Sequence, residues 1–352
     1  MKVHILYPFK EGPWGGANQF LGGLKNFLIL NKKHCESQYQ ADIILFNLNP
    51  SALLLLLLSK IKKIKKKYPK KILVVRIDGP VFLVRGKGLA IDRAFFNFTK
   101  NLADGVVYQS HWSKKNCFNL GMEEKEFQTT IVNAPDFAIF NRSGRKSWQA
   151  DSKIRLIATS WSANWKKGFD VYQWLDQNLD FARYEMTFVG NTPITFKNIQ
   201  HISPLPSQEL ARKFKNSDIF ITASRLEACS NSLIEALHCG LPVIGPNHSS
   251  NPDIIGRAGE VFNHAQELPE LIKKIAQSYE EYQARINLPS MEGVGKAYYD
   301  FMYSIYETVQ RGEYVPKRLT WTGYFRVMWS LWLWKGHERL TGMLNRFGGK
   351  KR

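Results

Sequence analysis

Cysteine is scarce in this sequence, and the four cysteines show no pairing pattern. Cys35, Cys117, Cys229 and Cys239 form neither a CxxC pair nor the spacing of a zinc site. A fold held together by disulfides or by structural zinc is therefore not expected, and a reduced cytosol suits these thiols. We predict that Cys117 and Cys239 are small core residues.

Long apolar runs are also missing. No run reaches the roughly eighteen residues that a membrane-spanning helix needs, so no segment is expected to cross a bilayer. No signal peptide is expected, because residues 1–7 run directly into a strand-like segment. With 352 residues and 44% hydrophobic composition, the chain is long enough for two globular domains with separate cores.

Acidic residues are few relative to basic ones, at 30 against 49, and the formal net charge is +19. Residues 60–71 hold eight lysines and no acid, while residues 311–352 hold ten Lys or Arg against two Glu. Each of these segments therefore carries +8, and the rest of the chain is close to neutral. The charge is a property of two patches rather than of the whole fold.

The most informative stretch is residues 218–245, DIFITASRLEACSNSLIEALHCGLPVIG. Residues 219–222 are apolar and β-branched, which is typical of a buried strand. Residues 231–237 have helical spacing, and Gly240 follows as a natural helix C-cap. Residues 241–245 predict the next strand, so the unit is the strand–loop–helix–strand crossover of parallel sheets.

Two acids, Glu227 and Glu235, lie on either side of the predicted helix start at Ser230, Asn231 and Ser232. Unpaired backbone N–H groups and the positive end of the helix dipole favour a phosphate at such a position. Glu235 would lie one turn into the helix, close enough to hold sugar hydroxyls beside the phosphate. Ligands of α/β proteins bind at this edge of the sheet.

Residues 227–243 read EACSNSLIEALHCGLPV, and this Glu-x7-Glu pattern followed by Ala-Leu-x-Cys-Gly-Leu-Pro-Val resembles the retaining, family-4 type glycosyltransferases. The resemblance implies an α/β fold with two Rossmann-like domains whose parallel sheets face each other across a cleft (the GT-B fold). It implies that Glu227 contacts the donor sugar and Glu235 the nucleotide ribose. The intervening amides, from Cys229 to Ser232, would bind the diphosphate. The opening glycines of the commoner form, Glu-Gly-Phe-Gly, are absent here.

The same resemblance assigns a cation to the loop after residues 154–158, a predicted strand. Lys167, in a Lys-Gly pair at a helix entry, matches the family lysine that neutralises the diphosphate. The family's arginine is replaced by Ser160, so its contact is either missing or supplied by Lys166 or Asn164.

Further donor contacts follow from strand ends and from a glycine loop. In the family, backbone at the ends of two neighbouring strands cradles the nucleobase, and a glycine loop after the first strand lines the cleft. Asp78, at the end of the strand at residues 72–77, stands where the family often has a histidine near the acceptor. The matching donor positions are Gly190, Asn191, Pro204 and Leu205 for the base and Gly15 and Gly16 for the loop.

The predicted domains are residues 1–140 for acceptor binding, a linker at 141–153, and residues 154–290 for the nucleotide sugar. A helix at 291–310 would return to the first domain, and residues 311–352 form a basic, Trp-rich tail. In this tail Trp321, Phe325, Met328, Trp329, Trp332 and Leu333 form one helical stripe. The stripe either docks on the first domain or rests in a membrane interface. The lysines of residues 60–71 allow two interpretations in the same way, a solvated helix face or a surface on anionic lipid.

These patterns and the resemblance predict a metal-independent, retaining glycosyltransferase of the hexosyltransferase type that needs no cofactor. Its donor would be a UDP or GDP sugar, and its acceptor a hydroxyl of a lipid-linked or cell-envelope glycan. We expect a cytoplasmic protein on the inner face of the membrane, attached through residues 60–71 and 318–352. The alternatives are a non-catalytic nucleotide-sugar-binding subunit and a basic nucleic-acid-binding protein. The second alternative lacks a recognition motif, so no nucleic acid is expected.

Overall fold

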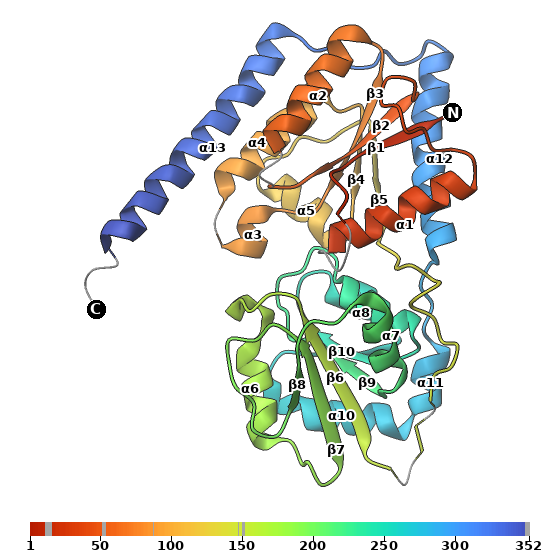
Figure 1. Cartoon of the computed structure of the whole chain (residues 1–352), viewed down its shortest axis with the longest axis vertical. Coiled ribbons are helices and arrows are strands. Elements are labelled where there is room, and N and C mark those ends of the chain that lie inside the picture. Colours follow the sequence, from red (N-terminus) through yellow and green to blue (C-terminus); the bar gives the residue numbers. More distant parts are fainter. Residues whose placement is uncertain (11–15, 51–53, 87, 147, 150–151, 349–352) are drawn as a thin grey trace. The chain divides into compact units, whose positions relative to one another are not determined.

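The computed structural model describes residues 1–10, 16–50, 54–86, 88–146, 148–149 and 152–348, with side chains up to residue 336. The chain forms two compact units (Figure 1). The first unit comprises Met1–Pro8, Lys25–Ile131 and Lys296–Arg352. The second comprises Phe9–Leu24 and Val132–Gly295. The domain boundaries that the sequence predicts stay predictions, because packing contacts do not show which segments fold on their own.

The first unit contains a parallel five-stranded sheet in the order β1-β2-β3-β4-β5. Every residue of β2, β3 and β4 is buried, as expected for a parallel sheet that is covered on both faces. The strands are β1 (Val3–Leu6), β2 (Ile43–Leu48), β3 (Ile72–Ile77), β4 (Gly105–Tyr108) and β5 (Phe127–Thr130).

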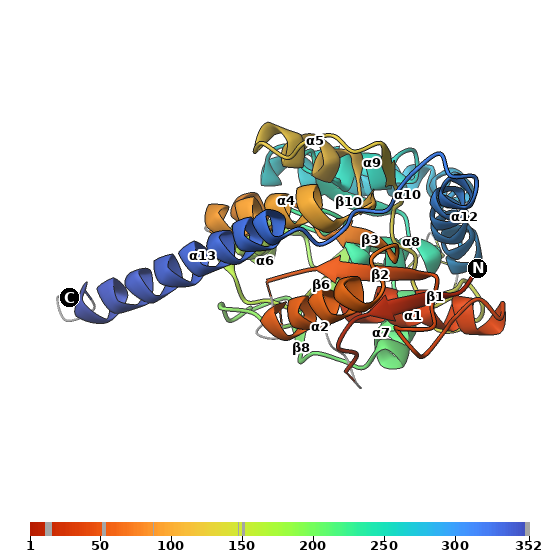
Figure 2. The same ribbon diagram turned by 90° about the horizontal axis from the view of Figure 1, so that it is seen from above.

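Helices pack on this sheet around a core that includes apolar residues of α2, α4 and α13. The helices with residues in the first unit are α1 (Gly16–Leu30), α2 (Leu54–Lys67), α3 (Val81–Arg85), α4 (Leu89–Leu102), α5 (His111–Asn119), α12 (Met291–Gln310) and α13 (Trp321–Gly348). Figure 2 shows α13 beside α4, with its C-terminal part continuing beyond α4. No helix in the described part of the chain is both long and apolar enough to cross a membrane.

The second unit contains a parallel six-stranded sheet in the order β11-β10-β9-β6-β7-β8. Alternate residues of its central strands face two different cores. Ile219 and Ile221 of β9 join one core and Phe220 joins the other, as a period of two requires. The strands are β6 (Ile154–Ser160), β7 (Tyr184–Gly190), β8 (Gln200–Ile202), β9 (Ile219–Ile221), β10 (Val243–Pro246) and β11 (Gly259–Phe262).

The two cores of this sheet are closed by two groups of helices. Residues of α6, α10 and α11 complete one core, and residues of α7, α8 and α9 complete the other. These elements are η1 (Trp165–Lys167), α6 (Phe169–Asn178), α7 (Ser207–Lys215), α8 (Asn231–His238), α9 (Asn251–Ile255), η2 (Ala265–Glu267), α10 (Leu268–Gln277) and α11 (Tyr279–Ala284). The predicted strand–loop–helix–strand unit of residues 218–245 is confirmed, with Gly240 in the left-handed region at φ +87° after α8.

Cys117 and Cys239 are buried core residues, as predicted. Two other details, at Lys65 and Met328, differ from the sequence interpretation. Lys65 is not part of a solvated lysine face. It is 2% exposed and its ammonium contacts the buried Asp104 at 3.3 Å, because residue 65 falls on the same side of α2 as Ile61 and Ile64. Met328 is only partly exposed and packs against the core of the first unit, unlike the rest of the predicted stripe.

Candidate functional site

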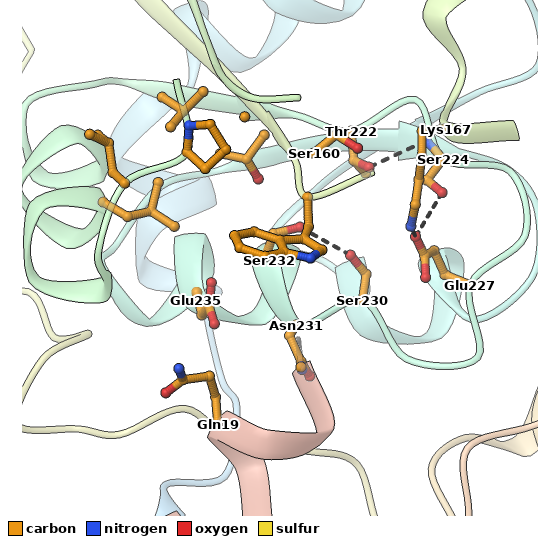
Figure 3. Close-up of a pocket in the computed structure, with 18 of the residues that line it drawn as sticks. Gln19, Ser160, Lys167, Thr222, Ser224, Glu227, Ser230, Asn231, Ser232 and Glu235 are labelled. Carbon is orange, nitrogen blue, oxygen red and sulfur yellow. Dashed lines mark hydrogen bonds and ion pairs between the residues drawn. The ribbon is translucent and has the colours of Figure 1, made fainter. Parts of the chain in front are cut away.

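A pocket of about 280 Å³ opens in the second unit (Figure 3). It is built from the ends of β6, β7 and β9, from the start of α8 and from the first turn of α1. Eleven of the residues that the sequence singled out line it: Gly16, Lys167, Gly190, Pro204, Leu205, Glu227, Cys229, Ser230, Asn231, Ser232 and Glu235.

The strand ends meet here because parallel strands place their carboxyl ends at one edge of a sheet. Ser160 ends β6 and Gly190 ends β7, and the two are paired across the ladder. Gly190 has φ +132°, and a Cβ at this position would lie 1.9 Å from the Ser160 carbonyl oxygen. Only glycine allows this close approach of the two strand ends, which forms one wall of the pocket.

The first turn of α8 presents its backbone to the pocket. Its N-cap residue Ser230 is 5% exposed, and the Ser230 side chain makes no capping hydrogen bond to the helix amides. The first N–H groups of an α-helix have no partner within the helix, and the helix dipole adds positive charge there. This turn is therefore suited to bind an anionic group of a ligand in the pocket.

Glu227 and Lys167 form an ion pair beside this turn (Figure 3). The carboxylate oxygen Oε1 of Glu227 accepts from the Lys167 ammonium and from the Ser224 hydroxyl, the latter at 2.7 Å. The Glu227 and Lys167 side chains are 17% and 31% exposed, so solvent reaches both. The pair places one negative and one positive group within reach of a ligand.

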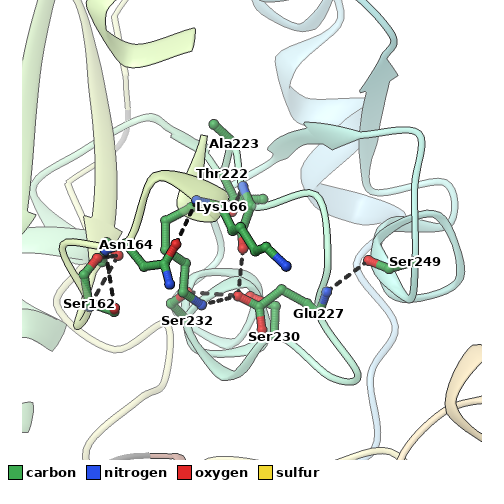
Figure 4. Close-up of polar contacts among 12 residues, drawn as sticks. Ser162, Asn164, Lys166, Thr222, Ala223, Glu227, Ser230, Ser232 and Ser249 are labelled. Carbon is green, nitrogen blue, oxygen red and sulfur yellow. Dashed lines mark hydrogen bonds and ion pairs between the residues drawn. The ribbon is translucent and has the colours of Figure 1, made fainter. Parts of the chain in front are cut away.

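The backbone of Glu227 is fixed by the loop that follows β10. The Glu227 amide donates to Ser249 Oγ at 3.1 Å (Figure 4). The Glu227 carbonyl accepts from Ser250 Oγ at 2.9 Å. Ser249 has φ +58°, an uncommon conformation for a residue with a side chain. Asn251, fully buried, donates from Nδ2 to the Ser224 carbonyl at 2.9 Å. These contacts fix the backbone that carries the Glu227 side chain and do not involve the carboxylate oxygens.

Glu235 is the other carboxyl group of the pocket. Desolvation raises its pKa to about 8 from an ordinary value of 4.5. The group is therefore largely protonated at neutral pH and can both donate and accept a hydrogen bond. Figure 3 shows Gln19 of α1 on the same side of the pocket as Glu235.

Asn231 closes the side of the pocket next to α1. Its Oδ1 accepts from Asn133 Nδ2 at 2.8 Å. Its Nδ2 lies so near Gly16 that a Cβ on residue 16 would come within 1.9 Å of it. A side chain at residue 16 would therefore displace the Asn231 amide from its present position. Gly15 lies outside the described residues.

Two of the sequence candidates support the pocket without lining it. Asn164 caps η1, where its side chain accepts from the Lys166 amide at 3.0 Å (Figure 4). Asn191 donates from Nδ2 to the Trp161 carbonyl at 2.7 Å and so fixes the loop after β6. Both contacts hold the segment that carries Lys167.

Asp78 belongs to the first unit, at the carboxyl end of β3. Its carboxylate pairs with Arg76 and accepts from Asn47 Nδ2 at 3.1 Å and from Gln109 Nε2 at 2.8 Å. The Arg76 side chain is fully buried, while Asp78 is 31% exposed. The ends of β2, β3 and β4 thus hold one carboxylate, facing solvent, in a fixed orientation.

Several polar lining residues were not found from the sequence. Ser160, Trp161, Thr222, Ser224 and Gln19 all line the pocket. A usable signal existed for Ser160, Thr222 and Ser224, which are polar residues at or just after the ends of buried strands. None existed for Gln19, because nothing local shows that α1 packs beside α8. Among the described residues, no three His, Cys, Asp or Glu side chains cluster as metal ligands would.

Part of the chain that lines this pocket matches a known protein family. Residues 196–287 match the sequence model of the family described as Glycosyl transferases group 1. This segment contains β9 and α8, and hence the stretch from which the resemblance was drawn. No curated protein sequence matches the chain.

Solved glycosyltransferase structures share the fold over most of the chain. Anabaena Alr3699/HepE, solved in complex with UDP-glucose, is 15% identical, with a TM-score of 0.60 over 88% of this chain and 100% of that one. The lipopolysaccharide outer core galactosyltransferase WaaB in its apo form is 13% identical, with a TM-score of 0.61 over 86% and 99%. WaaG, a glycosyltransferase involved in lipopolysaccharide biosynthesis, is 13% identical, with a TM-score of 0.55 over 88% and 98%. The predicted class, two parallel-sheet α/β domains of the GT-B type, is thereby confirmed.

Proposed function

We propose that this chain is a retaining, metal-independent glycosyltransferase that moves a sugar from a nucleotide diphosphate to a hydroxyl group. The observation that carries the proposal is the start of α8, which lines one pocket together with the Glu227 and Glu235 carboxyl groups and whose first amides have no partner within the helix. The family match over residues 196–287 and the shared fold of HepE, which was solved with UDP-glucose, support it.

Each end of the pocket suits one part of such a donor. The amides of Ser230 to Ser232 would bind the diphosphate, and the protonated Glu235 would hydrogen-bond the ribose hydroxyls. Backbone at Gly190 and Leu205 would border the base. Glu227 would hold the transferred sugar by its hydroxyls. We expect UDP or GDP as the nucleotide.

Transfer replaces the bond between the anomeric carbon and the terminal phosphate oxygen with a bond to the acceptor oxygen, and the proton of the acceptor hydroxyl passes to the leaving diphosphate. Charge then develops on the leaving diphosphate. The α8 amides and the Lys167 ammonium would stabilise that charge without a metal ion, which is the electrostatic form of catalysis. Lys167 would have to exchange part of its contact with Glu227 for the phosphate, since one ammonium serves both.

The acceptor is proposed to be a lipid-linked or cell-envelope glycan at the cytoplasmic face of the membrane. Its hydroxyl would be oriented in the first unit by Asp78, which the Arg76 contact keeps in a fixed direction. The basic segments at residues 60–71 and 318–352 favour an anionic membrane as the place of reaction.

Ligand binding and turnover test the proposal separately. UDP or GDP, and the matching nucleotide sugar, should raise the melting temperature of the purified chain in the presence of EDTA. Slow release of free sugar from the nucleotide sugar should fall about 100-fold or more in Lys167→Met and Glu227→Gln. Glu280→Gln, which changes an exposed carboxylate on α11, is the matched control and should leave both readouts unchanged. The proposal fails if no nucleotide raises the melting temperature.

A non-catalytic nucleotide-sugar-binding subunit is the second candidate. It is favoured by Ser160, which stands at the end of β6 where the resembled family has an arginine, and which is occupied by its contact with the Ser162 carbonyl at 2.8 Å. This candidate requires a melting-temperature shift with no turnover in the wild-type chain.

A further inference from the structure

Over residues 321–336, where side chains are described, helix α13 has one packed face and one exposed face of different chemistry. Val327, Leu331 and Trp334 are at most 8% exposed and join the core that contains α4. Ser330 Oγ accepts from Asn97 Nδ2 of α4 at 2.8 Å, which fixes the rotation of α13 about its axis. The first part of α13 is therefore an integral element of the first unit.

The opposite face is a strip of exposed apolar side chains, here called the aromatic strip. At about 100° of rotation per residue, its members project away from Val327 and Leu331. Phe325 and Trp329 stack with ring centres 6.1 Å apart, and Trp329 and Trp332 do so at 5.3 Å. The strip comprises Trp321 (87% exposed), Phe325 (57%), Trp329 (51%), Trp332 (65%) and Leu333 (48%). Contiguous apolar surface of this kind marks an interaction site.

Positive charge borders the strip. Arg326 and Lys335 are exposed, and the helical rotation places one on each side of it. On one flank, the Lys62 ammonium of α2 lies 4.1 Å from the ring centre of Tyr324, so α2 runs beside α13. The exposed α2 lysines are Lys60, Lys62, Lys63, Lys66 and Lys67, and no ion pair among the described residues involves any of them.

We infer that the aromatic strip and the exposed lysines of α2 form one surface that lies in the interface of an anionic lipid bilayer. Tryptophan prefers the boundary between headgroups and acyl chains, and lysines beside it are attracted to anionic headgroups. The apolar part between Arg326 and Lys335 is too short to span, so α13 would lie in the membrane plane. A second copy of the chain is a poorer occupant, because pairing two strips would also bring their basic flanks together. The link to a lipid-linked acceptor rests on the proposed function, whereas bilayer binding does not.

Vesicle sedimentation of the full-length chain tests the inference. The chain should pellet with vesicles of phosphatidylcholine containing phosphatidylglycerol and much less with phosphatidylcholine alone, and added salt should weaken binding. The triple variant Trp321→Ser, Trp329→Ser, Trp332→Ser should bind the anionic vesicles at least tenfold more weakly. The triple variant Lys60→Gln, Lys63→Gln, Lys66→Gln should also bind the anionic vesicles at least tenfold more weakly. All six side chains are exposed, so both variants should fold, which far-UV circular dichroism and the melting temperature check.

Two control variants match these changes elsewhere on the chain. Leu30→Ser, Phe137→Ser, Val315→Ser removes three exposed apolar side chains, and Lys115→Gln, Arg212→Gln, Arg257→Gln removes three exposed charges. Both should bind vesicles like the wild type. The inference is overturned if wild-type chain ignores anionic vesicles, or if the tryptophan variant binds them equally well. It is also overturned if that variant converts a dimer into a monomer in sedimentation equilibrium. Nucleotide-induced melting shifts, measured without vesicles, report on the proposed function independently.

Discussion

At the scale of single residues, the pocket contains two glutamates with different surroundings. The Glu227 carboxylate forms an ion pair with the Lys167 ammonium and accepts a hydrogen bond from the Ser224 hydroxyl. Among the described residues no ion pair involves Glu235, and desolvation raises its pKa. Two carboxyl groups whose environments differ in this way are suited to different tasks. In the proposed function the first would hold the sugar by its hydroxyls, and the second would hydrogen-bond ribose as a neutral acid.

The raised pKa of Glu235 makes a prediction about stability. Its folded-state pKa of about 8 lies above the ordinary 4.5, so the folded state loses stability as pH rises between these values, because the carboxyl ionises in the unfolded chain but stays protonated in the folded one. Glu235→Gln removes this cost. The free energy of unfolding of Glu235→Gln relative to wild type should therefore rise between pH 5 and pH 8, by an amount on the order of a few kcal/mol.

Urea denaturation of the two proteins at several pH values, without nucleotide, measures this difference. Glu280→Gln is the control, because its exposed carboxyl should give a difference that does not change with pH. A flat difference for Glu235→Gln as well would show that the Glu235 carboxyl is solvated in the unliganded protein.

At the scale of elements, one buried carboxylate joins the tail to the first sheet. Asp104 follows α4 and accepts from the Leu73 amide of β3 at 2.8 Å and from Lys65 of α2 at 3.3 Å. It also accepts from the Lys317 amide, ahead of α13, at 2.7 Å. Four segments distant in sequence thus share one anion, which positions α13 against α4.

Loss of this carboxylate should be costly. Asp104→Asn leaves the ammonium of Lys65, whose side chain is 1% exposed, without its counter-ion. Breaking a buried pair on one side typically destabilises by about 3–5 kcal/mol. We expect a fall of this order in the free energy of unfolding, measured by urea denaturation. The double variant Lys65→Met, Asp104→Asn should recover part of the loss, because no buried charge then remains unpaired. A double variant as unstable as the sum of both single variants would contradict the coupling.

At the scale of the whole molecule, each unit has its own sheet and core, and the candidate donor pocket lies in the second unit alone. A nucleotide should therefore stabilise one unit more than the other. Hydrogen exchange followed by mass spectrometry should show slower exchange with UDP or GDP in residues 160–168 and 224–235. Exchange in α4 and in the first part of α13 should stay unchanged. The same experiment with adenosine, which lacks a diphosphate, is the control. Protection confined to the first unit would place the nucleotide elsewhere.

The sequence by itself determined the class of the fold and the centre of the pocket. Parallel strands and amphipathic helices are encoded in local periodicity, and the stretch from Glu227 to Pro242 holds the loop and helix start of the site in consecutive residues. Eleven lining residues could be named, some because they lie at strand ends or at the start of α8 and the others because the family resemblance assigns them a donor contact.

Only the tertiary structure decided which polar groups are buried and with what partners. Lys65 looks like its neighbours in a lysine run, but its partner Asp104 is 39 residues away. The stripe of α13 was visible in the sequence, whereas the choice of Val327, Leu331 and Trp334 as the packed face depends on the shape of α4. Burial, the pKa of Glu235 and the partners of Asp78 all arise from contacts between segments that are distant in sequence. Local patterns do not contain that information, because the free energy of such contacts is set by the packed fold.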